Sequence, residues 1–146
     1  MKIKDCIIQP AQDIAMGKTV LDAAKVMQKH STRYLYVTDR KVPQGVVSST
    51  DIVSKLVAQG LPADKTKVEQ IMQSPLHACD ENDAIGDVYL KMAKFNLVSL
   101  PVLQKQKLIG IITMQELMRI FVEKGSSLEN KVEGKTKVEK RGSKKS

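Results

Sequence analysis

The heptapeptides GVVSSTD at residues 45–51 and GIITMQE at residues 110–116 follow the same pattern, 65 positions apart. Each consists of a glycine, two apolar residues, a hydroxyl residue, two variable residues and an acid. The β-branched residues are typical of a strand, whereas Ser or Thr followed by an acid favours the first turn of a helix. Both heptapeptides are therefore predicted to be strand-to-helix junctions.

The same ungapped spacing matches the sequence on both sides of the heptapeptides. Pro10 aligns with Pro75 and Met27 with Met92, and apolar residues align with apolar residues between them. One long period present in two copies predicts an internally symmetric pair rather than a solenoid of many repeats. We expect the chain to divide into a first repeat, a second repeat and a tail, at residues 1–60, 61–124 and 125–146.

Each copy is predicted to run strand, helix, strand, strand, helix, a mixed α/β (α+β) fold. Apolar residues at i, i+3, i+4 and i+7 from Val20 predict an amphipathic helix, with Thr19 and Asp22 as its capping pair. Asp83 is the expected cap of the corresponding helix in the second copy. Strands are predicted near Ile14 and Cys79 and in the apolar runs at residues 34–38, 45–48, 98–103 and 108–113.

The composition narrows the possible functions. Aromatic residues make up 3% of the chain and Trp is absent, which argues against single-stranded nucleic acid stacked on aromatic side chains. Two Cys and two His form no spacing typical of a metal site or a catalytic pair, so we expect no metal, no cofactor and no enzyme activity. No apolar run reaches the roughly 18 residues of a membrane span, and a cytoplasmic protein is expected.

Residues 125–146 differ from the rest of the sequence. They carry seven Lys or Arg and three Glu, and no apolar period continues through them. This composition predicts a basic disordered tail. Non-specific binding of nucleic acid through the tail is therefore one alternative function.

The two junctions could hold a ligand or simply stabilise a helix. A hydroxyl at Ser48 or Thr113, beside the free N–H groups of a helix start, suits a phosphate. A carboxylate at Asp51 or Glu116 can accept both hydrogen bonds of a vicinal diol such as a ribose. The same residues are also ordinary N-caps and first-turn acids. Spacing alone leaves both interpretations open.

The order and duplication of these motifs resemble the cystathionine-β-synthase (CBS) domain, and the pair resembles a Bateman module. The matching stretches include Ile71-Met72-x-x-Pro75, the helix at residues 85–94, VSLPV at 98–102 and both heptapeptides, within about residues 1–123. The resemblance implies two β-α-β-β-α units related by a pseudo-twofold axis, often assembled as a homodimer. It also implies a regulatory module that binds AMP, ADP, ATP or S-adenosylmethionine between the units. The regulated protein is expected to be a separate chain.

The resemblance assigns Asp51 to the ribose and Ser48 to the phosphate of a first site, and Glu116 and Thr113 to the same roles in a second. Arg33 would meet phosphate in the first site, whereas the second has Val98 at that position. Because Glu116 also replaces the expected Asp, we expect the first site to be the better one. The candidate ligand-binding residues are Gln12, Asp13, Ile14, Ala15, Arg33, Ser48, Thr50 and Asp51 in the first copy, and His77, Ala78, Cys79, Thr113 and Glu116 in the second. A structural dimerisation module with empty sites is the other alternative.

Overall fold

The computed structural model describes residues 1–135 of the chain. The first unit contains β1 (Asp13–Ala15), α1 (Val20–His30), β2 (Tyr34–Asp39), β3 (Val42–Ser48) and α2 (Ser49–Asp51), which continues as a π-helical segment, Ile52–Val57. The second contains β4 (Cys79–Asp80), α3 (Ile85–Lys94), β5 (Ser99–Gln104), β6 (Lys107–Thr113) and α4 (Met114–Lys135). The predicted order of elements is confirmed in both copies.

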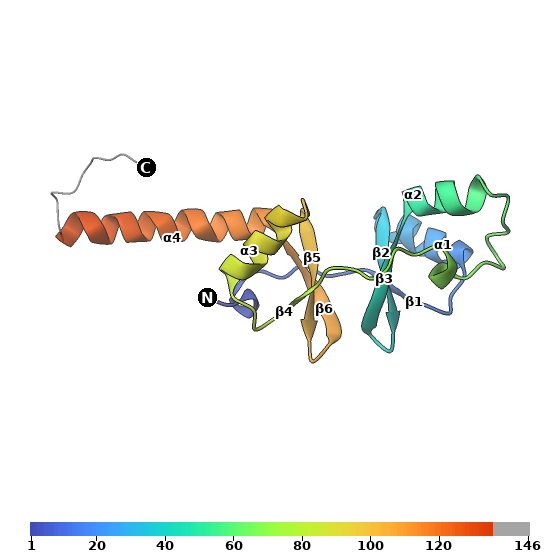
Figure 1. Cartoon of the computed structure of the whole chain (residues 1–146), viewed down its shortest axis with the longest axis horizontal. Coiled ribbons are helices and arrows are strands. Elements are labelled where there is room, and N and C mark those ends of the chain that lie inside the picture. The colour runs from blue at the N-terminus through green and yellow to red at the C-terminus, as the bar shows by residue number, and fades with distance from the viewer. Residues whose placement is uncertain (136–146) are drawn as a thin grey trace.

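Each unit has one three-stranded sheet with the same topology. The first strand runs parallel to the second, and the second and third form an antiparallel hairpin. Both hairpins turn on two residues with positive φ, Arg40-Lys41 and Lys105-Gln106, as a tight two-residue turn requires. The two sheets lie side by side in the middle of the molecule, and the helices cover their outer sides (Figure 1).

Each unit has its own apolar core between sheet and helices. In the first unit Val20 of α1 packs with Leu35 and Val47 of the sheet, and in the second Met92 of α3 packs with Leu100 and Ile112. All six side chains are almost fully buried. At about 25 cal/mol per Å², burial of such side chains is the main favourable contribution to the stability of each unit.

The segments that precede β1 and β4 pack on the opposite unit. Ile3 is fully buried in the core of the second unit, whereas Val68 is fully buried in the core of the first. Gln9 pairs with Ile111 of β6, and Gln73 pairs with Val46 of β3. We call residues 2–9 and 67–74 the lead segments. Because they are exchanged, residues 1–9 lie in space with the second repeat although they precede the first in sequence.

The glycine that begins each heptapeptide lies under a lead segment. A Cβ atom on Gly45 would come within 2.5 Å of the Gln73 carbonyl oxygen and 2.9 Å of the Met72 sulfur. A Cβ atom on Gly110 would collide with Ile8 and with the Gln9 carbonyl oxygen. The pattern therefore begins with glycine because a second backbone crosses the strand at that point.

Two expectations differ from the structure. Asp83 does not cap α3: its carboxylate accepts from the Asp80 N–H at 2.9 Å, and Ala84 occupies the N-cap position without a side-chain hydrogen bond. In addition, α4 continues through Lys135, so residues 125–135 of the expected tail are helical. No proline interrupts them, and extending a formed helix is easier than nucleating one. The remaining tail residues, 136–146, lie outside the described part of the chain. Within residues 1–135, every helix falls short of what a membrane crossing requires.

Candidate functional site

The first junction closes a complete capping box. The Asp51 N–H donates to Ser48 Oγ at 3.1 Å, and the Ser48 N–H donates to Asp51 Oδ2 at 2.9 Å. The Ser48 hydroxyl also lies 3.0 Å from Oδ2. These bonds satisfy donors that the start of α2 would otherwise leave unpaired. Thus one oxygen of the Asp51 carboxylate is fully engaged by its own cap.

The other oxygen of Asp51 faces one side chain from the next turn of the same helical stretch and one from a lead segment. Gln73 Nε2 and Lys55 Nζ each lie 3.2 Å from Oδ1. Gln73 belongs to the lead segment before β4, and the Lys55 side chain is 46% exposed. Burial alone would raise the pKa of the Asp51 carboxyl, but hydrogen bonds from Ser48, Gln73 and Lys55 outweigh it, so its pKa lies below the ordinary value. We call Ser48, Asp51, Lys55 and Gln73 the Asp51 site.

The second junction is built differently. The Glu116 N–H donates to Thr113 Oγ1 at 3.1 Å, as in the first copy, but the carboxylate is directed to Arg119 and Ile7. Arg119 Nε lies 2.9 Å from Oε1 and Nη2 lies 2.8 Å from Oε2, while the Ile7 N–H donates to Oε2 at 2.8 Å. The Arg119 guanidinium is the main reason that the pKa of Glu116 lies below its ordinary value. We call Ile7, Thr113, Glu116 and Arg119 the Glu116 site.

The structure pairs the carboxylates with lead segments in a way that the sequence did not indicate. The resemblance groups Asp51 with residues 12–15 and Glu116 with residues 77–79, each within its own copy. The structure adds a contact from a lead segment to each carboxylate: Asp51 contacts Gln73 and Glu116 contacts Ile7, each from the segment before the other unit's first strand. Gln73 and Lys55 were missed as site residues. The glycines at 45 and 110, which require a close backbone neighbour, are the sequence signal that could have found the lead segments.

Arg33 and Thr50 lie near the Asp51 site at its exposed edge. The Ser49 N–H donates to the Arg33 carbonyl at 2.8 Å, which places Arg33 beside the cap residue Ser48. The side chains of Arg33 and Thr50 are exposed. Val98 occupies the corresponding place in the second copy, where its carbonyl accepts from Met114, and is 79% exposed. The first site therefore has a cation available at a position where the second has an apolar side chain.

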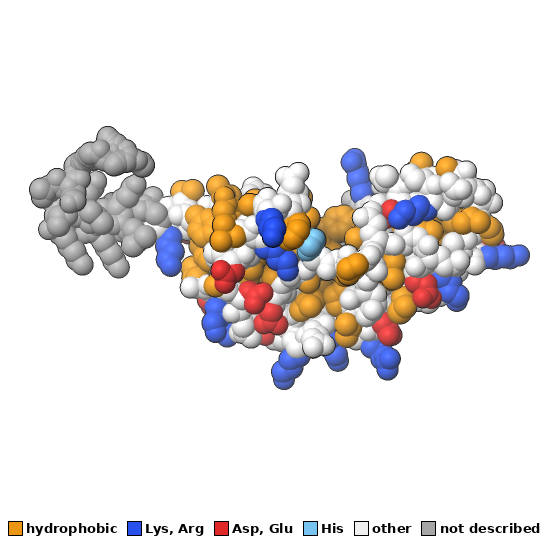
Figure 2. Space-filling model, in the orientation of Figure 1, with side chains coloured by type: hydrophobic (Ala, Val, Ile, Leu, Met, Phe, Trp, Pro, Cys, Tyr) orange, Lys and Arg blue, Asp and Glu red, His pale blue; other side chains and the backbone are white. Residues whose placement is uncertain are grey.

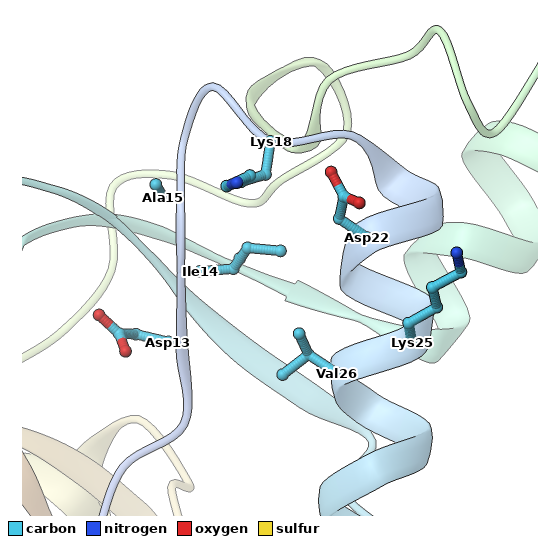
Figure 3. Close-up of a pocket in the computed structure, with 7 residues that line it drawn as sticks. All are labelled: Asp13, Ile14, Ala15, Lys18, Asp22, Lys25 and Val26. Carbon is cyan, nitrogen blue, oxygen red and sulfur yellow. The ribbon is translucent and has the colours of Figure 1, made fainter.

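The residues of β1 lie along a separate pocket. Ile14 is a core residue, and Asp13 accepts hydrogen bonds from Thr38 Oγ1 at 3.1 Å and Lys41 Nζ at 3.2 Å. A pocket of about 430 Å³ lies between β1 and α1, and Figure 3 shows its lining residues: Asp13, Ile14, Ala15, Lys18, Asp22, Lys25 and Val26. Its lining includes neither Ser48 nor Asp51. Gln12 is half-buried, and its carbonyl accepts from Tyr36 at 3.0 Å.

The corresponding residues of the second copy are held by local contacts. The exposed His77 ring stacks on Phe95 with ring centroids 4.2 Å apart. The Ala78 carbonyl accepts from Lys91 Nζ at 2.6 Å. Burial raises the pKa of the Cys79 thiol to about 12, so this buried thiol stays protonated near neutral pH. Among the described residues, no three His, Cys, Asp or Glu side chains gather as a metal site would need.

Both copies match one family model, that of the CBS domain, over residues 4–58 and 68–123. The CBS domain-containing protein YhcV of Bacillus subtilis is 25% identical over 115 residues, which are 79% of this chain and 81% of that protein. The L-aspartate semialdehyde sulfurtransferase of Methanocaldococcus jannaschii is 27% identical over 121 residues. These are 82% of this chain but 23% of that enzyme.

Solved structures share the fold. A CBS domain pair in complex with 5′-methylthioadenosine and S-adenosyl-L-methionine is 28% identical, with a TM-score of 0.63 over 85% of this chain and 98% of that chain. Hypoxic Response Protein I, solved with two coordinated zinc ions, is 22% identical, with a TM-score of 0.69 over 82% of this chain and 98% of that chain. The latter likeness concerns the fold alone. The expected mixed α+β fold of two units is thus confirmed by both comparisons.

Proposed function

The chain belongs to the CBS domain family as a tandem pair, and we propose that it is a regulatory module that binds an adenosine-containing nucleotide at the Asp51 site. The observation that carries this proposal is the burial of Asp51 Oδ1 and the identity of the side chains that contact it. This oxygen is buried, and its two partners are the side chains of Gln73 and Lys55, each at 3.2 Å. Neither partner is part of the cap, so a ligand can replace both without opening the start of α2.

A ribose diol has the hydrogen-bonding groups to take the place of Gln73 and Lys55. Two adjacent hydroxyls can donate to one carboxylate, and hydrogen bonds to a charged acceptor in a buried site are the stronger kind. The displaced Lys55 ammonium is half-exposed and would remain beside the ligand. Together with Arg33 it favours a ligand that carries phosphate, so AMP, ADP and ATP are proposed ahead of the sulfonium ligand S-adenosylmethionine.

The relatives support the class of ligand. A CBS domain pair at 28% identity was solved with 5′-methylthioadenosine and S-adenosyl-L-methionine, which both contain adenosine. The surface is also indented between the two units on the face shown in Figure 2, close to where lead segments cross from one unit to the other. Since the sulfurtransferase relative is matched over 23% of its length, we propose a regulatory role and no catalysis for this chain.

A thermal-shift screen tests the proposal. The chain is heated with AMP, ADP, ATP, S-adenosylmethionine and, as a control for the base, GMP. A ligand at about 100 times its dissociation constant should stabilise the protein by about 2.7 kcal/mol, which raises Tm by several degrees. We expect a shift with at least one adenosine phosphate and a smaller one with GMP. An unchanged Tm with every adenosine ligand would rule the proposal out.

We further propose that the module forms a homodimer through its second helices. Val53 and Val57 after α2, and Met118 and Val122 on α4, are 46–65% exposed. They occupy equivalent positions of the two copies, 65 residues apart. Figure 2 shows hydrophobic side chains over both regions. A second copy of the chain fits this surface because a twofold axis would bring two equal apolar strips onto each other.

A structural dimerisation module with empty sites is the second candidate. It is favoured by one observation: both junction carboxylates already have a full set of protein partners. The thermal-shift screen separates the two functions, because the structural module predicts a stable dimer whose Tm responds to none of the nucleotides.

A further inference from the structure

The Glu116 carboxylate is held in a different way from its counterpart, Asp51. Arg119 contacts both of its oxygens in a fork, at 2.9 and 2.8 Å, and the Ile7 N–H adds a third bond at 2.8 Å. Such two-pronged arginine–carboxylate pairs are short, strong and geometrically fixed. Glu116 is only 8% exposed, and each oxygen of its carboxylate already accepts from Arg119.

Arg119 is itself held in place from both sides along α4. Its Nη1 atom lies 2.8 Å from Glu123 Oε2, one turn further along the helix, while its other nitrogens hold Glu116 one turn before. The guanidinium is thus fixed between two acids at i−3 and i+4, where helix geometry brings side chains together. Displacing it would break two ion pairs at once.

The first copy has no equivalent of this arginine. The position 65 residues before Arg119 is Ser54, which is too short to reach the Asp51 carboxylate and lies exposed on the helix. Its place is taken by Lys55, whose ammonium contacts a single oxygen at 3.2 Å. A lysine on a flexible stem makes one such contact and can move away, whereas the planar guanidinium makes two.

We propose that Arg119 is the specificity-determining residue that closes the Glu116 site to ribose, so that the chain binds one nucleotide rather than two. This inference rests on the proposed function of the Asp51 site. In the Glu116 site a diol must compete with a fixed cation for both carboxylate oxygens. In the Asp51 site it competes with Gln73 and Lys55, each 3.2 Å from Oδ1, and with a longer contact of 3.4 Å from Gln73 to Oδ2. In other respects the Glu116 site resembles the Asp51 site, because it also has a hydroxyl, on Thr113, and a buried carboxylate.

Calorimetric titration with AMP, or with the nucleotide that gives the largest thermal shift, tests the inference through stoichiometry. Wild-type protein is expected to bind one nucleotide per chain. Arg119→Ser, which introduces the residue of the first copy, should bind two, the second more weakly. Arg119→Lys should also bind a second nucleotide, but more weakly than Arg119→Ser does, because a lysine can still make one contact with the Glu116 carboxylate. Arg40→Ser, which removes an exposed arginine paired with Asp39, is the matched control and should stay at one.

The Asp51→Asn variant separates this inference from the proposed function. If Asp51→Asn loses binding and Asp51→Asn/Arg119→Ser regains one site, both proposals hold. If the wild type binds one nucleotide and Arg119→Ser also binds one, the closure is wrong and the Asp51 site stands. If the wild type binds none and Arg119→Ser binds one, the closure stands and the Asp51 assignment is wrong. No binding by any variant overturns both. Should Arg119→Ser fail to fold, as judged by circular dichroism, Arg119→Met keeps the aliphatic stem and carries the same expectations.

Discussion

At the scale of single residues, the acidic side chains of the two junctions differ by one methylene group, because Glu116 occupies the position of Asp51. Asp51 is short enough to return to the Ser48 N–H and complete its own capping box. Glu116 keeps the bond between its N–H and the Thr113 hydroxyl, but its longer side chain reaches Arg119 and the Ile7 N–H. At the same position in two copies of one unit, one carboxylate therefore contacts Gln73 and Lys55 through Oδ1, whereas the other is held by Arg119 through both oxygens.

Replacement of the Asp51 carboxylate should weaken nucleotide binding. Asp51→Asn removes a charged acceptor, and loss of such a hydrogen bond costs about 1.5–3 kcal/mol, or roughly a 10- to 150-fold rise in Kd. Asp22→Asn is the control, because Asp22 closes the same kind of capping box with Thr19 at the start of α1. Calorimetry should show weaker binding for Asp51→Asn only. Equal losses of nucleotide affinity in both variants would mean that the loss comes from breaking a capping box and not from removing a contact to ribose.

Acid should weaken the contact between α4 and the N-terminal lead segment. The pKa of Glu116 is lower in the folded protein than its ordinary value of 4.5, so the unfolded state binds more protons. The stabilisation is complete above that value and is lost as pH falls through the folded pKa. Urea unfolding should therefore show wild type more stable than Glu116→Gln at pH 7, with the difference shrinking below about pH 4.5. A difference that stays constant down to pH 3 would contradict this account.

At the scale of elements, hydrophobic periodicity was sufficient to predict the order of the strands and helices, but not the continuation of α4 through residues 125–135. It was not sufficient to predict where the lead segments pack. Ile3 and Val68 are fully buried apolar residues, and the apolar pattern predicts that they are buried but not which unit buries them. For this reason Gln73 and Ile7 are absent from the predicted sites.

A side chain at the start of the second heptapeptide should displace a lead segment. In Gly110→Ala the new Cβ would meet Ile8 and the Gln9 carbonyl oxygen, and overpacking of this kind costs about 1–3 kcal/mol. Gly86→Ala is the control: its Cβ meets nothing within 4 Å, and alanine favours helix α3 by up to about 1 kcal/mol. Urea unfolding should show a loss of stability for the first variant and none for the second. An unaffected Gly110→Ala would mean that the N-terminal segment is not held on β6.

At the scale of the whole molecule, the internal repeat produces a symmetric scaffold with unequal sites. Symmetry makes equivalent helices expose Val53 and Val57 on one unit and Met118 and Val122 on the other. Such equal strips suit a twofold homodimer. The repeat was visible in the sequence, and so was the replacement of the expected Asp by Glu116, on which the prediction of a better first site rests. The role of Arg119 was not visible in the sequence. Its spacing from Glu116 on the helix allows the two-pronged contact with the carboxylate but does not require it.

Charge on the apolar strips should dissociate the homodimer. Val57→Glu/Val122→Glu places a carboxylate in the middle of each strip, where burial of an unpaired charge is strongly unfavourable. Sedimentation equilibrium should show a dimer for the wild type and a monomer for the double variant. Val98→Glu, at a 79% exposed position outside both second helices, is the control and should remain dimeric. A monomeric wild type would show that the chain forms no homodimer. A dimeric double variant would show that the apolar strips are not the dimer interface.

The site itself is tested most directly by nuclear magnetic resonance of ¹⁵N-labelled protein titrated with AMP. The largest shifts should fall on the Gln73 side-chain amide and on the backbone amides of Ser48 and Asp51. The Ile7 and Glu116 amides should change little, because Arg119 holds that carboxylate. Shifts concentrated at Ile7 and Glu116, or in the pocket between β1 and α1, would contradict the assignment of the nucleotide to the Asp51 site.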